Sequence, residues 1–146
     1  MTHEWERDGI VASDDPDRID MDTVYGFLRS AYWSAGIPRE TVEKSIRHSL
    51  AAGLYDGARM IGFARVVTDY ATFAYLGDVF VLEAWRGRGL ATWLTRCLVG
   101  HPELQGLRRW LLATRDAHGV YARVGFTPLA NPQSMMTIHD PDIYKR

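Results

Sequence analysis

Cysteine is almost absent from this sequence of 146 residues: Cys97 stands alone, so no disulfide can form within the chain. The five histidines and Cys97 lack the close spacings typical of metal ligands, and we expect no metal site. No run of about 18 apolar residues occurs, and the first residues form no apolar leader. We therefore expect a cytoplasmic protein with no membrane partner.

An excess of either charge is also missing. The 17 lysines and arginines and the 18 aspartates and glutamates give a formal net charge of −1. Nucleic-acid binding proteins usually carry a clear excess of positive charge, so no nucleic-acid partner is expected. At this length the chain is long enough to bury a core of its own, and we expect one domain over residues 1–146.

The apolar spacing predicts a mixed α/β (α+β) fold. Asp20 or Asp22 is expected to cap a first helix whose apolar stripe ends at Tyr32, and Pro38 to open a second helix that reaches Leu50. Further elements are expected as strands at 10–13, 60–69, 73–82, 110–113 and 126–128, helices at 90–98 and 117–123, an Asp56-Gly57 hairpin, and an edge strand at 135–138.

A six-residue loop, Arg86-Gly87-Arg88-Gly89-Leu90-Ala91, lies between an apolar strand pattern and a helix pattern. Two glycines allow a tight turn, and the first N–H groups of the following helix have no partner within it. Such a loop is either a plain turn or an anion site. It lacks the lysine of a P-loop and the third glycine of a dinucleotide-binding loop.

A second pattern follows some thirty residues later, and together the two resemble a known family. Arg86-x-x-Gly89-x-Ala91 resembles the [QR]-x-x-G-x-[GA] signature of the GCN5-related N-acetyltransferase (GNAT) superfamily. Tyr121 followed by Gly125-Phe126 resembles its second hallmark. The resemblance covers about residues 54–128. It implies a mostly antiparallel central sheet, a parallel strand pair that splays at the acetyl-CoA site, and helices on both faces.

The resemblance also implies a cosubstrate, acetyl-CoA, and therefore an acyltransferase. The pyrophosphate would lie on backbone N–H groups of Arg86, Gly87, Arg88, Gly89, Leu90, Ala91 and Thr92. The pantetheine arm would run along Val79, Phe80 and Val81, where we expect the parallel pair to separate after Phe80 or Val81. Asp116, which stands where many relatives carry asparagine, is placed at the cofactor as well.

Acetyl transfer to an amine requires a base for the ammonium proton and an acid for the departing thiolate. Tyr121 is the candidate acid, because a phenol matches an alkyl thiolate in pKa and is uncharged at neutral pH. Asp78 is the candidate base, with Glu83, Asp69 and Asp116 as alternatives. Cys97 lies on the apolar face of its helix and is interpreted as a core residue, so we expect direct attack without a covalent intermediate.

The acceptor site is expected to include Tyr32, Trp33 and Tyr75, with Arg65 holding a substrate carboxylate. A small molecule with a primary amine is the expected acceptor. A protein or peptide acceptor, a non-catalytic CoA-binding regulatory module, and a module for another nucleotide remain open alternatives. A homodimer is left open.

Overall fold

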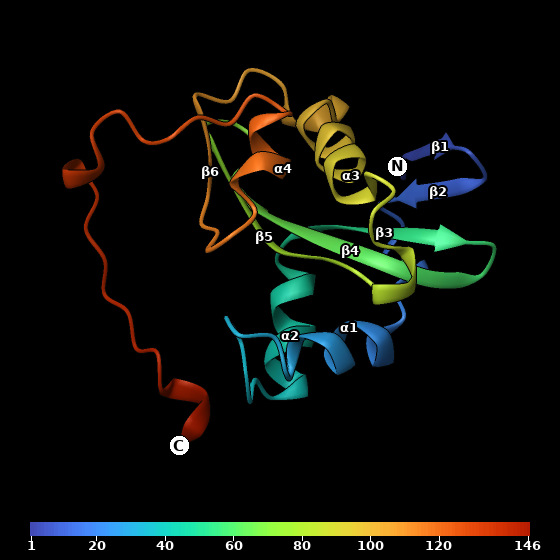
Figure 1. Ribbon diagram of the computed structural model, residues 1–146, viewed down its shortest axis with the longest axis horizontal. Coiled ribbons are helices and arrows are strands. Elements are labelled where there is room, and N and C mark those ends of the chain that lie inside the picture. Colours follow the sequence, from blue (N-terminus) through green and yellow to red (C-terminus); the bar gives the residue numbers. More distant parts are fainter.

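The computed structural model describes residues 1–146 and contains one six-stranded sheet with the order β1-β2-β3-β4-β5-β6 (Figure 1). Neighbouring strands are antiparallel except β5 and β6, which are parallel. The strands are β1 (Glu4–Arg7), β2 (Ile10–Ser13), β3 (Leu50–Asp56), β4 (Arg59–Thr68), β5 (Phe73–Val81) and β6 (Arg109–Leu112). The helices are α1 (Met21–Leu28), α2 (Arg39–Arg47), α3 (Leu90–Val99) and α4 (His118–Ala122).

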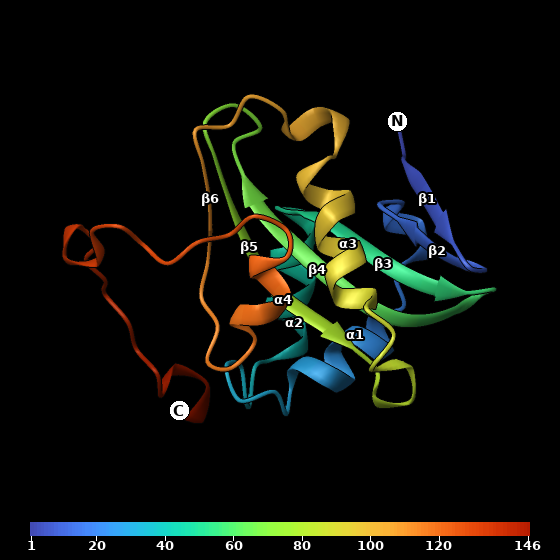
Figure 2. The same cartoon turned by 45° about the horizontal axis from the view of Figure 1, so that its top comes forward.

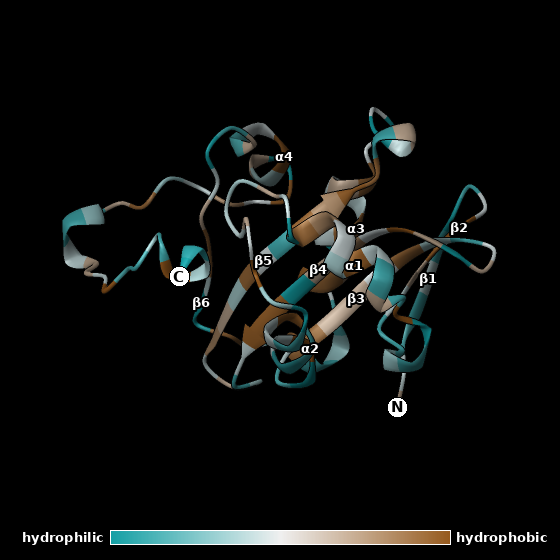
Figure 3. Cartoon of the chain, turned by 90° about the horizontal axis from the view of Figure 1, so that it is seen from below, coloured by the Kyte–Doolittle hydropathy of each residue, from teal (hydrophilic) through white to brown (hydrophobic).

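Helices cover both faces of the sheet, as expected (Figures 1 and 2). One core packs α3 against the sheet through Leu90, Leu94 and Leu98. The other packs α1 and α2 through Val24, Leu28 and Val42. Seen from below, the apolar colouring is concentrated along the central strands between these layers (Figure 3). No helix combines the length and apolarity needed to cross a bilayer.

The first two helices are shorter than the apolar spacing predicts. Asp20 is the cap of α1, accepting hydrogen bonds from the N–H groups of Asp22 and Thr23 at 3.1 and 3.4 Å. The helix ends at Leu28 because the Ser34 hydroxyl donates to the Leu28 carbonyl at 2.7 Å, in competition with a further helical turn. Leu50 was wrongly expected in α2; it pairs with Val66 as the first residue of β3.

The two ends of the chain also differ from expectation. The polar segment 4–7 forms β1, because Asp8 and Gly9 have positive φ values of 52° and 82° and close a tight hairpin onto β2. Residues 126–128 form no strand: the Phe126 N–H donates to the Tyr121 carbonyl at 3.2 Å, and Pro128 has no N–H to offer a ladder. Residues 135–138 pair with no strand of their own chain.

Candidate active site

The parallel pair β5 and β6 separates early and leaves a length of β5 without a partner on one side. Its register runs from Phe73 opposite Arg109 to Leu76 opposite Leu112 and goes no further, whereas β5 continues to Val81. The splay therefore begins after Leu76, which corrects the expected position at Phe80 or Val81. The open side of residues 77–81 presents backbone N–H and carbonyl groups, as the edge of a sheet does.

A bulge in β5 explains the early separation. Between the pairs Phe63–Phe80 and Arg65–Gly77, β4 advances two residues and β5 advances three. The extra residue lies at Asp78, whose φ of 55° is in the left-handed region. A bulge of this kind increases the local twist and turns the strand away from its neighbour. The periodicity of the strand does not reveal this bulge.

The glycine loop opens onto the N-terminus of α3. Gly87 and Gly89 have φ values of 81° and 72°, and the space where a Cβ would stand is open at both. No carbonyl of the chain accepts from the N–H groups of Gly87, Arg88 and Gly89. The first turn of α3 adds further N–H groups and the positive end of the helix dipole, so this segment can hold an anion.

Arg86 differs from the other loop residues in its bonding. Its N–H donates to the Glu83 carbonyl at 3.2 Å, and its side-chain Nε donates to the Val81 carbonyl at 3.0 Å. These two bonds tie the loop to the end of β5. The free backbone donors of the loop therefore begin at Gly87, one residue later than the sequence interpretation placed them.

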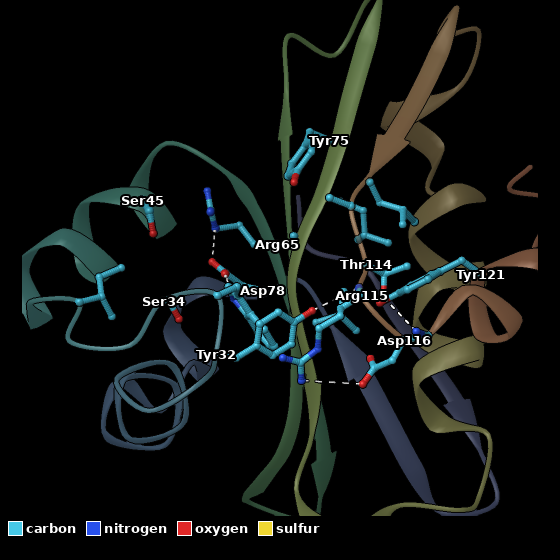
Figure 4. Close-up of a pocket in the computed structure, with 18 of the residues that line it drawn as sticks. Tyr32, Ser34, Ser45, Arg65, Tyr75, Asp78, Thr114, Arg115, Asp116 and Tyr121 are labelled. Carbon is cyan, nitrogen blue, oxygen red and sulfur yellow. Dashed lines mark hydrogen bonds and ion pairs between the residues drawn. The ribbon is translucent and has the colours of Figure 1, made fainter. Parts of the chain in front are cut away.

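A cavity of about 720 Å³ lies at the splay and contains most of the predicted catalytic and acceptor residues (Figure 4). Tyr32, Trp33, Arg65, Tyr75, Asp78, Val79, Asp116 and Tyr121 all line it. Phe80 does not, because its ring stacks on Phe27 in the core with centroids 4.1 Å apart. Of the alternative bases, Asp69 closes the β4–β5 turn by accepting from Thr72, and Glu83 also lies outside the cavity.

Tyr121 lies on α4 with its ring packed toward the α3 core and against Phe126. Burial raises the pKa of the Tyr121 phenol above its usual value, and the nearby Tyr32 phenol adds to that rise. The phenol is therefore fully protonated at neutral pH. Gly125, with a φ of 113°, ends this helical segment and lets the chain turn at Phe126.

Asp78 is held by two donors from different parts of the fold. Trp33 Nε1 donates to one carboxylate oxygen at 2.9 Å, and Arg65 Nε donates to the other at 2.8 Å. Arg65 also donates from Nη1 to the Ser49 hydroxyl at 3.2 Å. These bonds join the segment after α1 to the sheet and leave Arg65 with only part of its guanidinium free.

A contact across the cavity mouth was not anticipated from the sequence. The Arg115 guanidinium lies 3.8 Å from the centre of the Tyr32 ring, and the Arg115 N–H donates to the Tyr32 hydroxyl at 3.3 Å. Arg115 also forms a 4.0 Å ion pair with the exposed Asp116. Tyr144, near the C-terminus, lines the same cavity. The sequence feature that could have identified Arg115 is its position directly after β6, because the loops that follow parallel strands often carry functional residues.

Two groups outside the cavity bear on other expectations. Cys97 is buried, and burial raises the pKa of its thiol to about 11, as suits a core residue. His3, Asp14 and His101 form a cluster that the sequence did not predict. His101 Nδ1 accepts from the Glu103 N–H, so its Nε2 carries the proton that is donated to Asp14 at 2.7 Å.

Comparison with known proteins agrees with this geometry. The family model described as Acetyltransferase (GNAT) family matches residues 16–126. A GNAT-assigned acetyltransferase from Xanthomonas campestris pv. campestris is 47% identical, with a TM-score of 0.90 over 94% of this chain and 97% of that one. An acetyltransferase-assigned protein from Gibberella zeae is 28% identical over 82% of this chain and 79% of its own length.

One more distant crystal structure was determined with acetyl-CoA. It comes from Clostridium acetobutylicum, is 13% identical and has a TM-score of 0.63, with coverage of 95% of this chain and 96% of that one. At this identity the likeness concerns the fold alone. The family match, the splayed strand pair and the glycine loop before α3 agree with one another, and this chain belongs to the GNAT family of acetyltransferases.

Proposed function

We propose that this protein transfers the acetyl group of acetyl-CoA to the primary amine of a small molecule, by direct attack within a ternary complex. The observation that carries the proposal is the course of the open β5 edge, which runs from the cavity lined by the protonated phenol of Tyr121 toward the glycine loop with its free N–H groups before α3. The edge, the phenol and the N–H groups each serve one part of the reaction.

The cofactor would lie along the open β5 edge. In the proposed complex the pyrophosphate accepts hydrogen bonds from the N–H groups of residues 87–92, and the helix dipole of α3 adds attraction. The pantetheine amides pair with residues 77–81 as an added strand would. The acetyl-CoA reported in the Clostridium acetobutylicum structure of similar fold supports this cosubstrate. Arg86 acts by fixing the loop through its bond to Val81.

The chemical step forms a C–N bond and breaks the C–S bond of the thioester. The neutral amine attacks the carbonyl carbon, and backbone N–H groups near Val81 stabilise the oxyanion. As the intermediate collapses, the Tyr121 hydroxyl gives its proton to the departing thiolate and the amine proton passes to solvent, from which the Tyr121 phenolate then regains a proton. A phenol that stays protonated at neutral pH suits this role.

Asp78 is proposed to act on the acceptor side as a positioning residue. Each of its oxygens already accepts a hydrogen bond, from Trp33 or Arg65. Its charge attracts the ammonium form of the acceptor, and its bonds hold Trp33 and Arg65 in place around the amine. Asp116, exposed at the mouth, is the alternative site for proton removal through water.

A small acceptor fits the cavity better than a peptide does. The cavity volume of about 720 Å³ lies in the range of small-molecule sites and must also hold the end of the pantetheine arm. Tyr32 and Arg115 stack across its mouth, which narrows the path that an extended chain would need. Aromatic walls from Tyr32, Trp33 and Tyr75 favour an acceptor with an apolar body beside its amine.

An acceptor screen tests this function. Thiol release from acetyl-CoA should rise with at least one small primary amine and stay at the blank rate with lysine-containing peptides. Turnover with peptides alone would favour the protein acetyltransferase alternative. Stabilisation by CoA without turnover on any amine would favour a regulatory CoA-binding module, and stabilisation by ATP or NAD but not CoA would overturn the cosubstrate assignment.

A further inference from the structure

The outer edge of β6 is open. This strand pairs with β5 on one side, and no strand of the chain lies on the other. Natural proteins usually protect such an edge with charges, proline or a covering segment. In β6 only Arg109 is charged, and Trp110, Leu111 and Leu112 follow it. The edge can therefore accept another strand.

The chain also carries an uncovered apolar segment, residues 129–143, here named the C-terminal arm. Met136 and Ile138 are 97% and 106% exposed, and no Asp, Glu, Lys or Arg occurs from residue 129 to residue 138. The N–H groups of residues 136–138 have no backbone partner. Several exposed apolar side chains in one uncharged segment indicate a surface that is covered by a partner.

The arm does not lie along β6 of its own chain. Near one end, the Phe126 N–H is bonded to the Tyr121 carbonyl at 3.2 Å. At the other, Tyr144 lies against the turn at Gly36, where an added Cβ would meet the Tyr144 carbonyl oxygen at 2.8 Å. Between these two contacts the arm bows outward beyond β6 (Figures 1 and 2). Arg109 reaches it through a side-chain hydrogen bond to the Met135 sulfur at 3.7 Å.

We propose that two copies of this chain form a two-fold dimer in which residues 135–138 of each arm pair with the outer edge of β6 in the other copy. Each copy carries both an open edge and an unpaired strand segment, so the exchange satisfies both and closes at two. Phe73, which is 36% exposed, pairs with Arg109 at the start of β6 and adds apolar area next to the interface.

The dimer would bear on the acetyl-transfer cavity. Tyr144 follows directly after the arm and lines that cavity. Pairing of the arm with a second copy would fix its course and, with it, the wall that Tyr144 provides. The dimer itself does not depend on the proposed acetyl transfer, and its test needs no substrate.

Light scattering during gel filtration tests the dimer. The measurement should extend to a protein concentration of about 100 µM, so that a weak dimer is also detected. The wild-type protein should then have twice the mass of one chain. The double variant Met136→Asp/Ile138→Asp should run as a monomer with unchanged far-UV circular dichroism, because both side chains are exposed in the single chain. The control Asn131→Asp/Gln133→Asp places the same two charges in the arm outside the pairing segment and should remain dimeric.

Hydrogen exchange of the wild-type protein gives a second readout that needs no variant. The amides of residues 136–138 should be protected in concentrated solution and lose that protection on dilution. A monomeric wild type, a dimer that survives the Met136→Asp/Ile138→Asp change, an open-ended larger assembly, or unprotected amides at 136–138 in a dimer would each overturn the proposal.

Discussion

Asp78 and Tyr121 line opposite sides of the cavity and differ in the state of their polar atoms (Figure 4). Both oxygens of Asp78 accept hydrogen bonds from the protein, whereas the Tyr121 hydroxyl has no hydrogen bond to the protein. A proton donor must be free to reach the departing group, and a positioning residue must be fixed. This contrast at the level of single side chains supports the separate roles proposed for the two.

Removal of the Tyr121 hydroxyl should affect turnover without affecting cofactor binding. Tyr121→Phe keeps the ring against Phe126 and removes only the transferable proton. We expect kcat to fall by about 10² to 10⁴, with little change in KM for acetyl-CoA. Tyr144→Phe, which removes another hydroxyl from the cavity wall, is the control and should retain kcat. Single-turnover rates equal to wild type in Tyr121→Phe would contradict the acid role.

Tyr55 offers a test of stability that is independent of catalysis. Its hydroxyl is buried without a hydrogen-bond partner, and burial raises its pKa to about 12. Tyr55→Phe should increase the free energy of unfolding by about 1 kcal/mol, because an unsatisfied polar group is removed. The increase is measured by urea unfolding at neutral pH. Tyr25→Phe, at a half-buried ring on α1, should change it little.

The same residue predicts an alkaline loss of stability. The unfolded chain ionises Tyr55 near its ordinary pKa of 10.0, but the folded chain keeps the proton until about 12. Its contribution is therefore complete below pH 10 and declines as the pH rises from about 10 to 12. Tyr55→Phe should flatten this part of the stability curve. An equally steep decline in the variant would show that Cys97 or another group is responsible.

At the scale of elements, the glycine loop and the bulged β5 strand build the cofactor side together. Gly89→Val should abolish the stabilisation by CoA, because a branched side chain would project into the open space at the α3 N-terminus. Gly106→Val is a matched control: Gly106 has a similar φ of 78° and similarly open space, away from the cavity. Both variants should lose comparable intrinsic stability from backbone strain. Thermal unfolding with and without CoA separates the loss of CoA binding from the loss of intrinsic stability. If CoA raised the melting temperature of Gly89→Val as much as that of the wild type, the loop would be a plain turn with no role in binding CoA.

Elements with strong periodicity were predictable from the sequence, and those set by distant contacts were not. The hairpin at Asp56-Gly57, the helix from Leu90 and the parallel strand at 109–112 follow local patterns. The end of α1 depends on the Ser34 hydroxyl, and the splay depends on the bulge at Asp78. Neither leaves a local pattern. Of the predicted residues that line the cavity, only Tyr121 belongs to a GNAT hallmark. The others, such as Trp33 and Asp78, were expected from their places after the first helix and on the strand before the glycine loop, whereas Arg115 and Tyr144 were not predicted.

At the scale of the whole molecule, one buried cluster joins segments far apart in the chain. Asp14 accepts from the His3 N–H, the His3 ring and the His101 ring, and so ties the β1–β2 hairpin to the end of α3. Asp14→Asn should lower the free energy of unfolding by about 2 kcal/mol, because hydrogen bonds to a buried charge are lost. Urea unfolding measures the change, and the exposed Asp116→Asn should leave stability unchanged.

The acid limb of the stability curve follows from the same cluster. The hydrogen bonds from His101 and His3 hold the pKa of Asp14 below its ordinary value of 3.8, although burial opposes them. Asp14 therefore contributes stability above that value, and the contribution is lost as the pH falls through the lower folded pKa. In Asp14→Asn the free energy of unfolding should fall less steeply as the pH is lowered. If acid unfolding were unchanged in this variant, a carboxylate other than Asp14 would control it.

The most direct test of acetyl transfer in a ternary complex is mass spectrometry of the quenched reaction at equal concentrations of protein and acetyl-CoA, with and without an amine acceptor. The account predicts one acetylated amine for each free thiol when all three are present, and neither thiol release nor acetylated protein when the amine is omitted. Acetyl-protein that accumulates without the amine and then passes its acetyl group to it would contradict direct attack. Thiol release with no acetylated amine would contradict the proposed activity itself.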